Sequence, residues 1–170
     1  KVNRNKEKGK AFERRVAKHL SSVFGVNFTR TPNSGAHTGG MNAVNNFTQN
    51  QRLLLDGDII VPECLRNVVF ECKTKKVFSF PQLYKTCKVL EGWISQTTVH
   101  DKIWFLIFKI NNQGEYVAFD EKYSVNIFRM HTYHMYKMRY IIAPLADFFE
   151  DNKDLIIDIN NALDPDQLTN

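Results

Sequence analysis

One strand constrains the fold of this chain more than any other segment. Residues 102–110 contain the run IWFLIFKI, in which a single lysine interrupts the apolar side chains. A strand with large apolar side chains on both faces has to be covered on both faces. The run therefore predicts a central strand of a sheet. The turn residues 111–114 follow at once and lead into residues 115–119, which predicts a hairpin.

The rest of the chain predicts helices around this sheet. Apolar residues recur at helical spacing in four segments, and Gly25 is placed to end the first of them. Helices are expected over residues 6–24, 80–97, 145–150 and 155–163, and further strands over residues 26–30, 58–61, 68–73 and 140–143. This order predicts an α/β fold with a mixed central β-sheet flanked by helices.

Length and composition favour one domain. With 170 residues, of which 43% are apolar, the chain can bury one core. We expect a single domain over residues 1–170, with a core at about 7–120 and a C-terminal helical extension at about 121–165.

Two acidic residues and a lysine stand at the ends of two neighbouring apolar runs. Asp58 opens Ile59-Ile60-Val61, and Val68-Val69-Phe70 leads into Glu71-Cys72-Lys73. If the runs form a hairpin, alternation places Glu71 and Lys73 on one face and Cys72 on the other. Two carboxylates on adjacent strands can hold a hard divalent cation, and a nearby lysine can orient a water beside a phosphate. The arrangement is typical of phosphodiester cleavage.

This triplet has a simpler interpretation, because a Glu/Asp-x-Lys triplet is expected about once by chance in a chain of this length. Asp151-Asn152-Lys153 is a second one, without an apolar strand before it, and is interpreted as the cap or solvated end of a helix. Asp58, Glu71 and Lys73 could likewise be an exposed cross-strand ion pair. The strand context favours the catalytic interpretation.

Charge and cysteine content limit the partners and the compartment. The formal net charge of +5 is concentrated in Lys1–Lys18, Lys73–Lys88 and Arg129–Arg139, which suggests a polyanionic partner. The three cysteines lack metal-type spacing and are expected to be reduced thiols of an intracellular protein. No apolar run reaches membrane-spanning length, so no membrane partner is expected.

The segment from Thr31 to Gln51 differs from the rest. It is rich in glycine and asparagine and has almost no large apolar residue. A long irregular segment inside a compact domain is usually a functional lid, a binding loop or a disordered insertion. We expect it to close on the substrate.

Four pieces in order resemble the PD-(D/E)xK nuclease superfamily, and within it most closely the archaeal-type Holliday-junction resolvases. The pieces are Gly9-Lys10-Ala11-Phe12-Glu13-Arg14 on the first helix, Arg30 followed by Ser34-Gly35, Asp58-Ile59-Ile60, and Glu71-Cys72-Lys73. The resemblance covers residues 8–76. It departs in having Gly57 where the family usually has proline, and in a longer loop over residues 31–51.

The resemblance implies a restriction-endonuclease-like core and a role for each matched residue. Asp58, Glu71 and the Cys72 main-chain carbonyl would hold Mg²⁺, for which Mn²⁺ could substitute. Glu13 would bind metal through water or a second ion, and Lys73 would position the attacking water. The residues expected to contact DNA are Arg30, Ser34, Gly35, Lys75, Lys76, Gln82 and Lys85.

Several of these residues have alternative interpretations. Glu13 with Arg14 could be a solvated helix face, and Gln82 a helix-surface amide. Asp56 could be a further ligand, although a turn residue is favoured. The lysines after residue 73 could be an ordinary charged surface. Cys72 is expected in the core, and His131 with His134 as a solvated pair.

We therefore expect a Mg²⁺-dependent DNA endonuclease, selective for branched or junction DNA and acting as a homodimer, because paired cuts require two-fold symmetry. Such an enzyme would act in DNA recombination and DNA repair. We expect an intracellular protein, either cytoplasmic or nucleoid-associated, and a phage-encoded or organellar protein is an open alternative. The alternatives are a restriction, homing or repair nuclease on the same core, and a DNA-binding module without cleavage.

Overall fold

The computed structural model describes residues 4–32, 56–98, 102–123 and 128–163. Its elements are α1 (Arg4–Phe24), β1 (Thr29–Arg30), β2 (Ile59–Ile60), the short 3-10 helix η1 (Glu63–Leu65), β3 (Val68–Lys75), η2 (Phe80–Tyr84), α4 (Lys88–Thr97), β4 (Ile103–Ile110), β5 (Gly114–Asp120), η3 (Glu121–Tyr123), β6 (His134–Tyr136), β7 (Tyr140–Pro144) and α5 (Phe148–Ala162). Five strands form the central sheet in the order β3-β4-β5-β7-β6. Strands β3 and β4 are parallel and the other neighbours are antiparallel. The predicted α/β fold with a mixed sheet flanked by helices is confirmed.

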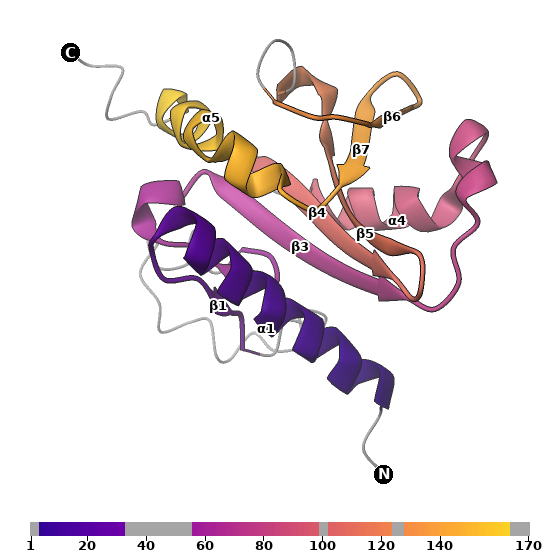
Figure 1. Ribbon diagram of the computed structural model, residues 1–170, viewed down its shortest axis with the longest axis horizontal. Coiled ribbons are helices and arrows are strands. Elements are labelled where there is room, and N and C mark those ends of the chain that lie inside the picture. Colours follow the sequence, from indigo (N-terminus) through magenta and orange to yellow (C-terminus); the bar gives the residue numbers. More distant parts are fainter. Residues whose placement is uncertain (1–3, 33–55, 99–101, 124–127, 164–170) are drawn as a thin grey trace.

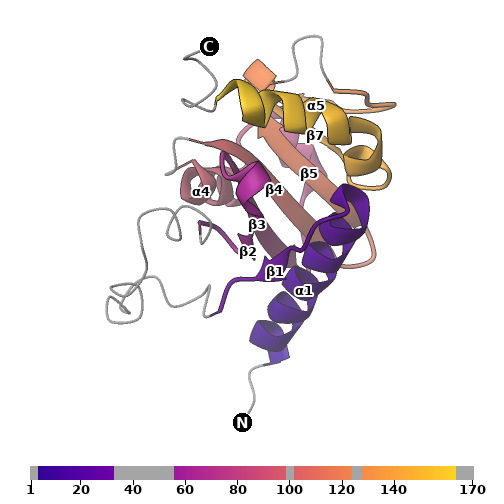
Figure 2. The same cartoon turned by 90° about the vertical axis from the view of Figure 1, so that its left-hand side faces the viewer.

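The sheet is covered on both faces, as its central strand requires. Helices α1 and α5 lie on one face and α4 on the other (Figures 1 and 2). In β4, every side chain except Lys109 is buried. Its alternate residues belong to two apolar cores: Phe105 packs under α1 and α5, whereas Phe108 packs under α4. The predicted central position of this strand is confirmed.

Helix α1 is amphipathic, and its apolar face packs on the sheet. Its buried residues include Phe12, Val16 and Leu20, which follow the helical period. Gly25 then adopts a φ of +70° and its N–H donates to the Ser21 carbonyl at 3.0 Å, which ends the helix as predicted.

The helix predicted over residues 80–97 is wrong in its first half. The chain instead forms η2 and then α4, separated by Lys85, whose φ and ψ of −134° and −106° are not helical. The N–H of Cys87 donates to the Tyr136 hydroxyl at 2.8 Å, and Leu83 is buried nearby in the same core. Contacts with a strand far along the chain therefore override the helical periodicity.

The C-terminal region was expected as a helical extension, but it also supplies two strands of the sheet. Strand β7 confirms the strand predicted at 140–143, whereas β6 was not predicted. The two predicted helices are one, α5, and Asn152, which lies between the predicted segments, is fully buried within it. Its amide nitrogen donates to the carbonyls of Phe148 at 2.8 Å and Arg129 at 3.0 Å. Sequence polarity at this point therefore marks a buried hydrogen-bonding residue and not a break.

A second buried asparagine in α5 holds the connection between β2 and β3. Asn160 accepts a hydrogen bond from the Asn67 N–H at 3.0 Å and donates to the Cys64 carbonyl at 2.9 Å. Buried polar groups are favourable only when they are paired. Helix α5 thus fixes the position of η1.

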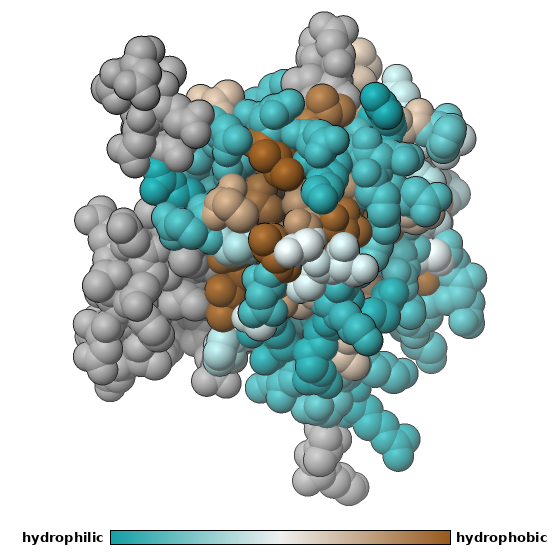
Figure 3. Space-filling view, turned by 60° about the vertical axis from the view of Figure 1, so that its left-hand side comes forward, coloured by the Kyte–Doolittle hydropathy of each residue, from teal (hydrophilic) through white to brown (hydrophobic). Residues whose placement is uncertain are grey.

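On the face in Figure 3, hydrophilic residues surround a central group of apolar ones. None of the helices in the described part of the chain combines the length and apolar character that crossing a bilayer requires.

Candidate active site

Asp58 lies at the free edge of β3. Its N–H donates to the Phe70 carbonyl at 3.0 Å, and its Oδ2 accepts from the Cys72 N–H at 2.8 Å. The side chain is only 7% exposed. The hairpin predicted for the two runs is wrong, because β2 pairs with β1 and β3 pairs with β4. Asp58 itself, and not a strand ladder, connects the two segments.

Glu71 lies next to Asp58, where burial and the neighbouring acid disfavour its charged form. Burial and the charge of Asp58, together with a hydrogen bond to Asp58, raise the pKa of Glu71 to about 8, and Lys73 opposes this only in part. Lys73 Nζ is 3.5 Å from Glu71 Oε2. The three sequence-predicted residues therefore come together as two acids that share a site and one lysine beside them.

Cys72 turns its side chain into the core and its backbone toward Asp58. The thiol is buried, as predicted, and burial followed by the nearby carboxylates raises its pKa well above the usual range. In a strand, the N–H and C=O of one residue point to the same side. Since the Cys72 N–H points to Asp58, its carbonyl oxygen also faces this edge, where the resemblance places it as a ligand.

Glu13 approaches from α1 but is held by Arg30. Arg30 Nε donates to Glu13 Oε2 at 2.5 Å, and the two side chains are 13% and 18% exposed. The charge of Glu13 reaches Cys72, where it contributes to the raised pKa. The alternative of a solvated helix face therefore does not describe Glu13. Two residues predicted for separate roles form one ion pair beside the carboxylates.

No group of three or more His, Cys, Asp or Glu in the described residues converges as a metal site. The carboxylates that do converge are the pair Asp58 and Glu71. Mg²⁺ is commonly held by one or two carboxylates together with water and substrate phosphates, so a pair is sufficient for this cation. Burial and then the charge of Asp58 raise the pKa of Glu71, and a cation would relieve the repulsion between the two carboxylates.

Asp56 and Thr31 show what else surrounds the site. Asp56 pairs with Lys102 at 2.9 Å, and this lysine side chain is only 8% exposed, which favours a structural role. The Thr31 N–H donates to the Asp58 carbonyl at 2.9 Å. The predicted loop therefore starts beside Asp58, while Ser34, Gly35 and most of the loop lie outside the described residues.

The other predicted DNA contacts divide into two groups. Lys75 and Lys76 are exposed at the end of β3, directly after Lys73. Gln82 and Lys85 are exposed as well, but the neighbouring Leu83 carbonyl lies 3.2 Å from His134 in β6, at the opposite edge of the sheet from β3. The structure therefore does not bring Gln82 or Lys85 to the carboxylates.

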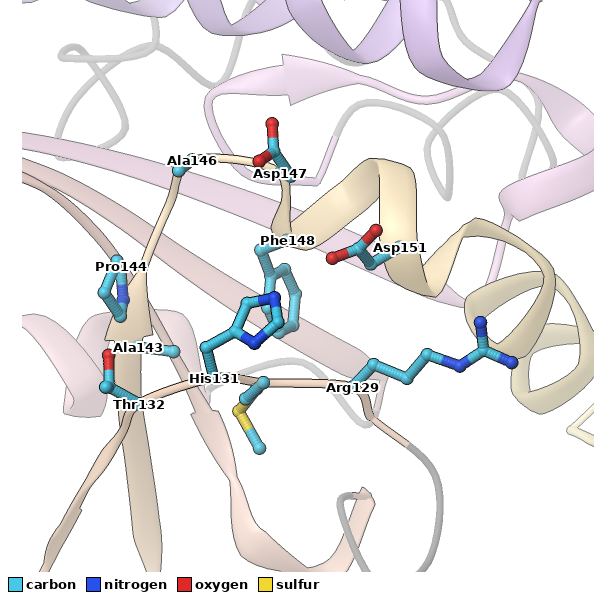
Figure 4. Close-up of a pocket in the computed structure, with 10 residues that line it drawn as sticks. Arg129, His131, Thr132, Ala143, Pro144, Ala146, Asp147, Phe148 and Asp151 are labelled. Atoms are coloured by element: carbon cyan, nitrogen blue, oxygen red, sulfur yellow. The ribbon is translucent and has the colours of Figure 1, made fainter.

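The two histidines do not form a site. His134 belongs to β6, and His131 lines a separate pocket of about 80 Å³ together with residues of α5 (Figure 4). In this pocket the His131 ring lies beside Phe148, with Asp147 and Asp151 above it. Asp151 belongs to the second Glu/Asp-x-Lys triplet, and it lines a pocket that contains none of the candidate site residues.

Gly57 explains the departure from the usual Pro-Asp sequence. Its φ is +78°, and a Cβ there would lie 2.6 Å from the Phe70 carbonyl oxygen. Proline is restricted to a φ near −65° and could not make this turn. Glycine at this position lets the chain approach β3 closely enough for Asp58 to bond with it.

Gly57→Ala should destabilise the protein by roughly 2–5 kcal/mol, because left-handed backbone strain and the clash with Phe70 add together. It should also reduce any activity that depends on Asp58. Thermal unfolding measures the first effect. Gly92→Ala is the matched control, since a Cβ at this helical glycine meets nothing within 4 Å. Equal melting temperatures for the two variants would show that the Gly57 turn is not required.

Comparison with known proteins adds one match. A family model described as phage putative PDDEXK endonuclease matches residues 4–163. Neither a curated protein nor a solved structure matches the chain.

Proposed function

The chain belongs to the phage putative PDDEXK endonuclease family, and on this premise we propose that it is a Mg²⁺-dependent endonuclease that hydrolyses phosphodiester bonds in branched DNA. Membership of the family and the α/β fold agree with a nuclease of the PD-(D/E)xK superfamily. The cation, the branched substrate and the catalytic residues are our proposal.

The observation that carries this proposal is the paired, partly buried carboxylates of Asp58 and Glu71. The pKa of Glu71 is raised to about 8, mainly by burial and then by Asp58. An acid with a strongly raised pKa beside a specific charged partner is typical of functional sites. A module that only bound DNA would have no need for two acids facing a phosphate backbone.

Each residue has a defined part in the proposal. Asp58, Glu71 and the Cys72 carbonyl would hold Mg²⁺ or Mn²⁺, which supplies Lewis-acid stabilisation of charge on the phosphate when bound. Lys73 would orient the attacking water, with Glu71 fixing its ammonium group. Glu13 would act through Arg30, by holding the guanidinium where it can contact a backbone phosphate.

Selectivity for branched DNA rests on the ordered resemblance of residues 8–76 to junction resolvases. A homodimer is proposed for the same reason, because two symmetric cuts need two sites. A restriction, homing or repair nuclease would use the same carboxylates with other DNA contacts.

Incubation of a four-way junction and of a linear duplex, each with Mg²⁺ and with EDTA, tests the proposal. We expect the junction to be cut in Mg²⁺ only, and the duplex to be cut slowly. Equal cutting of both substrates would contradict the selectivity. Absence of any product, with DNA binding retained, would favour a binding module instead.

A further inference from the structure

A basic groove of about 680 Å³ is lined by residues of α1 and α4 and by the ends of β3 and β4. Thr74 in its wall follows Lys73 in the chain, and Phe12 in its wall precedes Glu13, so on both elements a groove residue is the chain neighbour of a candidate site residue. It carries the side chains of Lys8, Arg15, Lys75, Lys76, Lys109 and Trp93. We propose that one unpaired strand of the nucleic-acid substrate lies in this groove, with its phosphates against the lysines and a base against Trp93.

The charge of the groove indicates a polyanion. The chain has 23 basic and 18 acidic side chains. At this ratio, about two of any five charged residues on a surface would be acidic. The described lining has five basic residues and no acidic one. Phosphate is the group that such a surface recognises in a nucleic acid.

The five cations differ in whether the protein already neutralises them. Arg15 and Lys109 both pair with Glu115, which fixes them on the wall between α1 and β5. Lys8, Lys75 and Lys76 are exposed, and no carboxylate within the described ranges forms a salt bridge with them. These three ammonium groups are therefore the ones expected to exchange counterions for phosphates.

Trp93 makes the groove suited to a single strand. Its ring is stacked on Phe78 with centroids 6.2 Å apart and packs on Phe108 at 5.6 Å, so it is held rigidly, yet it lines the groove and is only half-buried. A rigid aromatic beside a basic track is typical of single-strand binding, because an unpaired base can stack on it. In a duplex the bases are already stacked on each other.

This inference rests on the proposed function in its substrate class, but its test needs no cleavage. The full-length protein in EDTA is titrated with single-stranded oligothymidine, a blunt duplex and a duplex with a single-stranded flap. Trp104 is 3% exposed, so a change of tryptophan fluorescence on binding reports on Trp93. We expect quenching by the single strand and the flap and not by the blunt duplex, and loss of this quenching in Trp93→Phe.

The lysines are tested by salt dependence. Replacing Lys8, Lys75 and Lys76 by glutamine should lower the slope of log affinity against log salt by about 2 for single strands, and lower the affinity about a hundredfold at 0.1 M salt. The matched control replaces Lys88, Lys122 and Lys153, which do not line the groove. It should leave the slope nearly unchanged.

The outcomes separate the two ideas. Blunt duplex binding as tightly as the single strand, no quenching, or equal slopes for the two triple variants would overturn the groove while leaving cleavage untouched. Binding and quenching as expected, with no cleavage of any substrate in Mg²⁺, would overturn the nuclease proposal and retain the groove.

Discussion

Replacing Glu71 by glutamine, or Asp58 by asparagine, is expected to lower DNA cleavage at least about a thousandfold while DNA binding is retained or becomes tighter. The expected loss corresponds to several kcal/mol of charge stabilisation at the phosphate. Binding should not weaken, because removing a negative charge reduces repulsion of the backbone. Cleavage rates under single-turnover conditions and DNA affinity in EDTA measure the two effects.

Asp151→Asn is the matched control, because Asp151 belongs to the same type of triplet but is exposed in α5. It should leave cleavage unchanged. Loss of cleavage and of DNA binding together in Glu71→Gln, with a lower melting temperature, would instead assign Glu71 a structural role.

Glu71→Gln should also make the metal-free protein more stable at alkaline pH. With an ordinary pKa of 4.5 in the unfolded chain and about 8 in the folded protein, Glu71 holds a proton between these pH values only when folded. The unfolded chain then binds fewer protons, so stability falls as pH rises through this window. The full shift corresponds to at most ~5 kcal/mol above pH 8. Glu71→Gln removes this loss.

Melting temperatures in EDTA at pH 5 and pH 9 test this. The variant and the unchanged protein should be similar at pH 5, and the variant should melt roughly 5–15 °C higher at pH 9. Glu91→Gln is the control, because its neighbours Lys137 and Tyr136 lower the pKa of Glu91 and no such gain is expected. Parallel pH profiles for Glu71→Gln and the unchanged protein would mean that neither burial nor Asp58 raises the pKa of Glu71 in solution.

Local patterns were sufficient to predict the parts of the fold that depend on them. The helical period of α1, the apolar run of β4 and the turn before β5 identify these elements directly. Alternation in β3 also placed Cys72 in the core, with Glu71 and Lys73 together on the other side.

The elements and contacts that the sequence could not indicate depend on residues far apart in the chain. Tyr136 ends the helical pattern before α4 by accepting the Cys87 N–H. Strand β6 is followed by a turn in which Lys137 and Met138 adopt φ values of 51° and 52°, without the glycine or asparagine that usually signals such a turn. The pairing of Glu13 with Arg30 joins residues 17 positions apart, and no spacing rule connects a helix to a strand in this way.

The hydrogen bonds of Asn160 have a consequence for the order in which the protein matures. This residue holds Asn67 and Cys64, which precede it by 93 and 96 positions, and so fixes the connection between the segments that carry Asp58 and Glu71. A chain emerging from the ribosome folds from its N-terminal end. Until α5 has been synthesised, the Asn67 N–H and the Cys64 carbonyl lack the partner that Asn160 provides. We therefore expect the connection between β2 and β3 to become ordered only late in synthesis, although Asp58 itself bonds directly to β3.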